Sequence, residues 1–443
     1  MDEYSRIDEF NSPGFITGLT QPEQGVCCPI TMTHAVVPAL RHQPELALEW
    51  EPRVLSRHYD PRCIPAAEKA GVTFGMAMTE KQGGSDVRAN TTTAMPLGQP
   101  GPGQAYEITG HKWFCSAPMS DAFLTLARTP EGLSCFLVPR WRPDGSRNPF
   151  FIQRLKDKLG NRSNASAEIE YAGTYGVMVG EPGRGVPTII EMVHQTRLDA
   201  ATAPVGMMRQ ALVQALHHCR HRQAFGKPLI EQPLMRNVLA DLALEVEAGT
   251  ALVMRVARAF DESHRNPTAR AFARIATAVT KFWTNKRAPE FIYEAMECLG
   301  GAGYIEESIL PRLFRESPLN SIWEGSGNVM CLDVLRAIQR DPLTLECFLT
   351  ELAQARGANR DLDAAMERLQ RELRTAEQAE LRARRLVELM ALTLQGSLLV
   401  RHAPPEVADA FCASRLAAEG WHVYGALPSA TAADALLERA GQI

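Results

Sequence analysis

The hydrophobic pattern of this 443-residue chain changes its period partway along, and that change decides which folds are open to it. From Val72 to about Val179, short runs rich in β-branched and aromatic residues alternate with Gly, Pro and Asp, which is typical of strands and turns. The TPEG segment at 129–132 lies between two such runs and predicts a hairpin. After 180–187 (GEPGRGVP), apolar residues such as Leu212 and Leu216 recur with the period of a helix. The chain is therefore predicted to be an α+β protein.

Four regions follow from this pattern. Residues 1–70 mix helical pieces, such as CCPITMTHAVVPAL, with turns, and residues 71–179 form the β domain. Residues 180–341 are predicted to form a helical bundle, and residues 342–443 a last helical region of mixed charge.

The charge and cysteine content exclude several classes of protein. There are 47 Lys and Arg residues against 51 Asp and Glu residues, so the net charge of −4 excludes nucleic-acid binding through bulk charge and leaves only a local patch. No window approaches the roughly 18 apolar residues of a membrane span, and the acidic start has no signal-peptide core. The ten cysteines form no CxxC pair, which indicates reduced thiols. We therefore expect a cytoplasmic protein without a membrane partner.

The usual nucleotide and metal motifs are missing. No GxGxxG follows a strand, and Gly226-Lys227 is followed by Pro228, so neither a Rossmann fingerprint nor a P-loop is present. His217 and His221, with Cys219 between them, have the spacing of metal ligands, but no second ligand group accompanies them. Cations at the end of a helix are the better interpretation, and no metal site is expected.

Two segments of the β domain could contact a planar ligand. MTEKQGGSDV at 78–87 places Thr79 and Ser85 around two glycines, which is either an ordinary turn or a loop whose backbone and hydroxyls bind a ligand's polar edge. Trp113 in GHKWFCSAPMSD is either a core residue or a platform, with Ser116 placed to bind a ring nitrogen.

The segment NSIWEGSGNVM at 320–330 carries the most specific chemistry. Glu324 lies between Trp323 and Gly325, just before a predicted helix. A loop glutamate is usually solvated. A carboxylate flanked by an aromatic residue and glycines is, however, a candidate base near neutral pH, because desolvation raises its proton affinity.

These segments together resemble a known family. MTEKQGGSDV, HKWF, HRQAFG, ECLGGAGY and IWEGSGN occur in the order and spacing of the acyl-CoA dehydrogenase flavoprotein family. The resemblance covers nearly the whole chain and is greatest to the branch of that family that belongs to the adaptive response to DNA alkylation. It implies a helical N-terminal part, a β-barrel-like middle domain, and a C-terminal four-helix bundle plus an extra helical region. It also implies FAD between the middle and C-terminal domains, and a homotetramer.

The resemblance also assigns site residues. Those that would bind FAD are Met78, Thr79, Gly84, Ser85, Trp113, Ser116, Ala117, Pro118, Ile322, Trp323, Gly325 and Asn328. Arg222 and Phe225 match residues that reach the FAD of a neighbouring subunit, with the planar guanidinium neutralising the pyrophosphate. Glu324 matches the catalytic base, which removes the proton α to a thioester while the β-hydride passes to the flavin.

The chain departs from the family pattern at several positions. Lys81 and Gln82 replace the usual Pro-Gly, Glu297 replaces a Gln, and His194 stands where many members carry an Asp used for acyl-CoA. The chain also begins where the family is partway through its N-terminal helices, so we expect either a shortened member or a gene start upstream.

Double-stranded DNA is the partner that the resemblance implies for the C-terminal region. At about 100° per residue, five arginines fall within about 120° of one another: Arg368, Arg371, Arg374, Arg382 and Arg385. Arg336 and Arg340 lie on the preceding helix, and such a stripe can meet phosphates. Interleaved glutamates favour the alternative of a solvated, salt-bridged helix.

Three functions remain open at this stage. The first is a DNA-associated FAD protein of the alkylation response with weak acyl-CoA dehydrogenase activity, whose small ligand is an acyl-CoA or an alkylating agent. The second is a metabolic dehydrogenase for short or branched acyl-CoA. The third is a scaffold without a cofactor.

Overall fold

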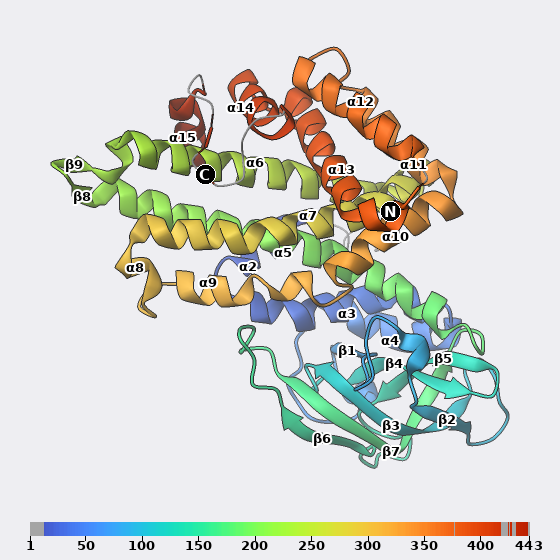
Figure 1. The fold of residues 1–443 in the computed structure, drawn as a ribbon. Coiled ribbons are helices and arrows are strands. Elements are labelled where there is room, and N and C mark those ends of the chain that lie inside the picture. The colour runs from blue at the N-terminus through green and yellow to red at the C-terminus, as the bar shows by residue number, and fades with distance from the viewer. Residues whose placement is uncertain (1–12, 376, 418–423, 425, 428–430, 442–443) are drawn as a thin grey trace. The chain divides into compact units, whose positions relative to one another are not determined.

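The computed structural model describes residues 13–441 except 376, 418–423, 425 and 428–430. These residues form two compact units: residues 23–196, and residues 13–22 together with 197–441. The long helix α5 (Gly185–His221) begins in the first unit and ends in the second. Figure 1 shows the strands β1 to β7 gathered in the first unit and the long helices in the second.

The first unit is built around a seven-stranded sheet. Its strands are β1 (Phe74–Ala77), β2 (Thr93–Pro96), β3 (Ala105–Ser116), β4 (Ala122–Thr129), β5 (Gly132–Pro139), β6 (Phe150–Leu155) and β7 (Ser166–Val179). The order is β1-β4-β2-β3-β7-β5, with β6 paired to β7 beside this path. Because β5 also pairs with β4, five of the strands close into a ring. This is the β-barrel-like domain that was predicted. The predicted hairpin is confirmed, because Thr129 pairs with Gly132.

Short helices cover one part of this sheet. They are η1 (Gln24–Val26), α3 (Cys27–Leu40), α4 (Pro44–Val54), η2 (Ala66–Glu68) and η3 (Val87–Ala89). Trp50 of α4 meets Phe74 of β1 edge to face, with 5.3 Å between ring centroids, and both side chains are buried. Burial of such apolar surface is the main force that holds α4 on the strands.

The second unit is helical. Its first elements are α2 (Pro13–Thr20), the rest of α5, β8 (Gln223–Ala224), β9 (Lys227–Pro228), η4 (Leu229–Glu231), α6 (Pro233–Glu262), α7 (Pro267–Leu299), α8 (Gly301–Tyr304), α9 (Leu310–Glu316), η5 (Leu319–Ser321) and α10 (Gly327–Arg340). They are followed by α11 (Pro342–Ala353), α12 (Arg360–Arg374), α13 (Ala379–His402), α14 (Pro405–Phe411), the π-helix Cys412–Leu416 and α15 (Ala433–Gly441). Among the described residues, no helix is long and apolar enough to span a membrane.

One hydrophobic core runs through the whole second unit, including the region after Asp341. Phe348 of α11 stacks on Phe272 of α7 with 6.1 Å between ring centroids. The indole N–H of Trp283 on α7 donates to Gln395 Oε1 on α13 at 2.9 Å. The helices after residue 341 therefore share the core of the bundle.

The predicted single arginine face over 368–385 is wrong. The chain leaves α12 at Arg374 and begins α13 at Ala379, with Gln378 in the left-handed region at φ 51°. Arg382 holds this turn together, because it pairs with Glu372 Oε2 at 2.7 Å and donates to the carbonyl of Glu377. The angular spacing on one continuous helix therefore does not apply to these arginines.

Candidate functional site

The loop after β1, for which the sequence left open an ordinary turn or a ligand-binding loop, is folded back on itself. The carbonyl of Thr79 accepts from the Trp113 amide at 2.8 Å, and that of Met78 accepts from Asn90 Nδ2 at 2.9 Å. A Cβ added to Gly84 would lie 2.7 Å from Thr79 Oγ1, so only glycine fits this close approach. The structure thus brings Met78, Thr79, Gly84 and Trp113 together, with Ser85 exposed on the same loop.

A buried ion pair anchors this loop. Glu80 and Lys112 are 2.7 Å apart and both side chains are fully buried. Glu80 also accepts from the Thr91 amide at 2.7 Å, and Lys112 donates to the Leu126 carbonyl at 2.8 Å. Burial raises the pKa of Glu80, but the Lys112 ammonium and the hydrogen bonds from Thr91 and Thr92 outweigh it and lower that pKa to about 2. Burial lowers the pKa of Lys112 to about 8, against the effect of Glu80.

The Trp113 indole is half-buried on β3 and lies beside two ammonium groups. Lys156 Nζ is 3.3 Å from the ring centroid and Lys81 Nζ is 5.2 Å from it. Lys156 also pairs with Glu168 at 2.7 Å. The ring is therefore held partly by cation–π contact, and it is not a core residue.

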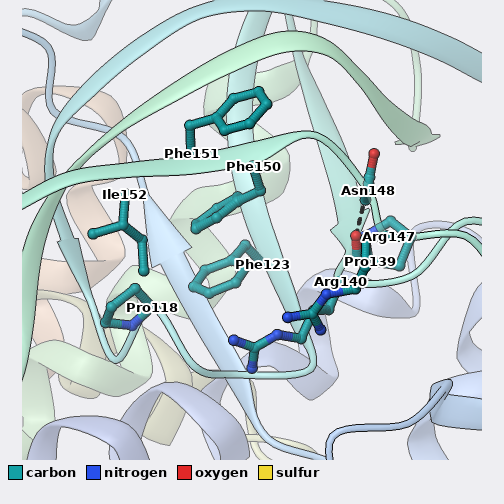
Figure 2. Close-up of a pocket in the computed structure, with 9 residues that line it drawn as sticks. All are labelled: Pro118, Phe123, Pro139, Arg140, Arg147, Asn148, Phe150, Phe151 and Ile152. Carbon is teal, nitrogen blue, oxygen red and sulfur yellow. Dashed lines mark hydrogen bonds between the residues drawn. The ribbon is translucent and has the colours of Figure 1, made fainter.

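The end of β3 turns sharply after Ser116. Ala117 has φ 50°, and its amide donates to the Ala165 carbonyl at 2.8 Å. Pro118 lines a hollow of about 220 Å³, which the sequence did not reveal (Figure 2). Its floor is the stacked pair Phe123 and Phe150, 5.0 Å apart, and the guanidinium groups of Arg140 and Arg147 also line it. These residues come from four different segments, so no local pattern could have grouped them.

In the second unit, the Glu324 loop has an unusual backbone. Glu324 has φ 56° and Gly325 has φ 100°. The carbonyl of Glu324 accepts from Arg197 Nε at 3.0 Å, and the Trp323 indole donates to Asn320 Oδ1 at 2.7 Å. A glutamate in the left-handed region is uncommon and is kept only where its surroundings hold it.

A buried lysine lies behind this loop. Lys281 Nζ on α7 donates to the carbonyls of Asn320, Trp323 and Gly325 at 2.8, 2.9 and 2.8 Å. Its side chain is 1% exposed, and burial lowers the pKa of Lys281 to about 7, while the Glu324 carboxylate acts in the opposite direction. Sequence reasoning did not identify Lys281, because a lysine in a helix normally indicates a solvated position.

The remaining predicted residues of this unit are exposed. Ile322 is 66% exposed, and Asn328 is exposed in the first turn of α10. Phe225, 96% exposed with φ 53°, lies at the tip of the β8–β9 hairpin beside Arg222. Within the described part of the chain, the Arg222 side chain has no hydrogen-bond or ion-pair partner. Figure 1 shows this hairpin and α10 at opposite ends of the helical unit, so one chain does not bring Arg222 and Phe225 to the Glu324 loop.

The arginines that were predicted to contact DNA differ in whether their side chains already bind other groups of the protein. Arg336 and Arg340 are exposed on α10, and no ion pair to either occurs among the residues that the structure describes. Arg371 is 4.0 Å from Glu367, and Arg368 donates to the Leu416 carbonyl at 3.3 Å. Arg382 is committed to the α12–α13 turn.

The residues of each unit, taken separately, fit an FAD. The first unit offers a glycine-lined loop that a Cβ would fill, next to a half-buried indole. The second offers the exposed guanidinium of Arg222 and the exposed phenyl ring of Phe225 on one hairpin. The guanidinium suits a pyrophosphate, and the ring suits a planar group.

Three family models match the chain in succession. Residues 14–61 match the AidB N-terminal domain of the adaptive response protein, residues 75–174 the acyl-CoA dehydrogenase middle domain, and residues 183–339 the acyl-CoA dehydrogenase C-terminal domain. The chain belongs to the acyl-CoA dehydrogenase family, and it is therefore an FAD oxidoreductase of the acyl-CoA dehydrogenase type.

Within that family the chain is similar to AidB. AidB of Escherichia coli K12 is 46% identical over 401 residues, which cover 90% of this chain and 73% of AidB. Acyl-CoA dehydrogenase family member 11 of Caenorhabditis elegans is 33% identical over 87% of this chain and 67% of its own length. The crystal structure of Caenorhabditis elegans ACDH-11 in complex with C11-CoA has a TM-score of 0.82 at 30% identity, covering 90% of this chain and 73% of that one. The predicted family, fold class and cofactor are confirmed.

Proposed function

We propose that this chain is an FAD-containing protein of the DNA alkylation response that binds duplex DNA and has a weak acyl-CoA dehydrogenase activity, with Glu324 as the catalytic base. The observation that carries the enzymatic part is the Glu324 loop, whose left-handed backbone is held by Arg197 and Lys281. A base is effective only when its carboxylate is fixed relative to the proton it removes. The match to the AidB N-terminal domain supports the link to the alkylation response.

Residues of both units are assigned to the cofactor. Met78, Thr79, Gly84 and Ser85 would hold FAD through the loop after β1, and Trp113 with Ser116, Ala117 and Pro118 would line its ring. Ile322, Trp323, Gly325 and Asn328 would contact it from the segment that precedes and opens α10. When bound, FAD supplies the acceptor for the β-hydride of the substrate. The task left to the protein is to orient the thioester and to take its α-proton on Glu324.

The exposed hairpin supports the assembly that we propose. Arg222 and Phe225 are far from α10 in one chain and exposed. They would therefore serve the FAD of a neighbouring copy in a cytoplasmic homotetramer.

Anaerobic titration of the yellow protein with acyl-CoA esters tests the enzymatic part. Because ACDH-11 was crystallised with C11-CoA, a medium-chain ester is tried beside short and branched ones. We expect slow bleaching of the flavin absorbance that is lost in Glu324→Gln and retained in the matched control Glu307→Gln, an exposed carboxylate. Bleaching that persists in Glu324→Gln would rule out this base. Rapid bleaching by short or branched esters without DNA binding would favour the metabolic alternative.

The DNA part is supported by the two exposed arginines of α10, neither of which forms an ion pair with any residue that the structure describes. Affinity for DNA falls with salt, and each phosphate contact adds about 0.9 to the steepness of log affinity against log salt concentration. The double variant Arg336→Gln, Arg340→Gln should therefore make this dependence less steep by about 1.8. Arg162→Gln, an exposed arginine of the first unit, is the matched control and should leave the slope unchanged. No retention of duplex DNA by the unaltered protein at low salt would refute DNA binding.

A further inference from the structure

The conformation of the Glu324 loop is determined by cations on other helices. Lys281 binds the carbonyls on both sides of Glu324, those of Trp323 and Gly325, and Arg197 binds the carbonyl of Glu324 itself. Three consecutive carbonyls are thus each fixed by a charged donor. Successive peptide planes that are fixed in this way also fix the direction of the Glu324 Cα–Cβ bond.

The contacts of Lys281 require its charged form. Nζ has three carbonyl acceptors within 2.9 Å, and only an ammonium has three hydrogens to donate. The site is buried in the core of the second unit, where a hydrogen bond from a charged donor is strongest. Packing of α7 alone does not explain a lysine at this position, because an uncharged methionine would fill about the same volume.

A second network supports Arg197. Its Nη1 is 3.2 Å from Asp333 on α10, and Asp333 receives both terminal nitrogens of Arg274 at 2.9 and 2.8 Å. Arg197 is therefore anchored independently of Lys281. Removal of Lys281 should free the carbonyls of Trp323 and Gly325 and leave that of Glu324 bound.

We propose that Lys281 is a positioning residue for Glu324, which holds the 320–325 loop in the conformation that presents the carboxylate to the substrate. This inference rests on the proposed role of Glu324 as the base. The lysine touches no reacting atom, so its effect is on the rate of proton removal and not on the binding of acyl-CoA.

Hydrogen–deuterium exchange of the flavin-loaded protein tests the hold on the loop. In Lys281→Met we expect the amides of 321–323, which donate to the carbonyls of Pro318 and Leu319, to exchange at least about tenfold faster. The loop opens more often without its charged donor, because a hydrogen bond from a charged group is worth more than one decade in an equilibrium constant. Exchange in the rest of α7 should be unchanged, and Lys281→Arg should restore most of the protection. The matched control Arg258→Gln, an exposed cation on α6, should have no effect on the loop.

Single-turnover reduction by acyl-CoA tests the consequence. Lys281→Met should lower the rate of flavin reduction by about 10²-fold, the effect of a misplaced catalytic group, with an unchanged half-saturating acyl-CoA concentration and rescue in Lys281→Arg. Unchanged loop exchange, or a uniform rise in exchange across the whole bundle, would overturn the proposal. If no acyl-CoA reduces the unaltered protein, the role of Glu324 fails, while the exchange comparison still decides whether Lys281 holds the loop.

Discussion

At the scale of single residues, the site depends on charged groups that are buried rather than exposed. Lys112 and Lys281 both lie in the interior with oxygen partners at 2.7 to 2.9 Å. A buried charge is stable only when it is paired and hydrogen-bonded, so these lysines are committed to particular backbone conformations. One holds the loop after β1, and the other holds the loop of Glu324.

The Glu80–Lys112 pair makes the stability of the first unit dependent on acid. The pKa of Glu80 is about 2 in the folded state against 4.5 ordinarily, so its stabilising contribution is complete above pH 4.5 and is lost as the pH falls toward 2. In Glu80→Gln this contribution is absent at every pH. The difference in unfolding free energy between the two proteins should therefore narrow below pH 4.5 by as much as about 3 kcal/mol. Urea unfolding at a series of pH values measures it, and a constant difference would contradict the role of this pair.

At the scale of elements, the sequence predicted what depends on local periodicity. The helix after EGSGN and the hairpin at 129–132 were found, because their apolar spacing and turn residues are local signals. The break between α12 and α13 was missed, since Gln378 adopts a left-handed conformation without any Gly or Pro there. The two buried lysines were missed for a related reason: burial of a lysine is set by carbonyls that come from distant segments. The roles of the predicted site residues remain predictions.

The packing of α2 on α5 depends on one glycine. A Cβ on Gly206 would lie 2.5 Å from the Thr17 carbonyl, and it would also meet the Oγ1 of buried Thr20. Gly206→Ala should therefore displace α2 and cost about 2 kcal/mol of unfolding free energy, as overpacking does. Gly18→Ala on α2 itself, where nothing lies within 4 Å, is the control and should be neutral or slightly stabilising. Denaturant unfolding measures the stability of the two variants, and limited proteolysis at α2 reports whether that helix is displaced. Equal stability of Gly206→Ala and Gly18→Ala would show that the packing of α2 does not depend on the close approach at Gly206.

At the scale of the whole molecule, the region after residue 341 is part of the enzyme and not an attachment to it. Buried Arg415 of the π-helix pairs with Asp241 and, at 3.3 Å, with Glu245, both on α6. The carboxylate of Glu351 on α11 forms ion pairs with Arg255 of α6 and Arg401 of α13, each with a nitrogen–oxygen distance of 2.7 Å. The pairs of Arg415 with Asp241 and Glu245, and of Arg255 with Glu351, cross between the bundle and the added helices inside one hydrophobic core. A displacement of the added helices would therefore be transmitted to α7, which carries Lys281, and to α10, which follows the Glu324 loop.

A chain that ends at Asp341 tests this continuity. It would expose the face of Phe272 on α7 that Phe348 covers, and it would leave Asp241 and Glu245 buried without Arg415. Removing one partner of a buried ion pair alone costs about 3–5 kcal/mol, and the exposed apolar surface adds to this. We expect the shortened chain to aggregate or to bind a hydrophobic dye, without a cooperative thermal transition. Arg415→Met in the full-length chain should remain folded but lose several degrees of melting temperature, because only the ion-pair term is removed. A shortened chain that stays monodisperse and melts cooperatively would show that the bundle has a core of its own, independent of the added helices.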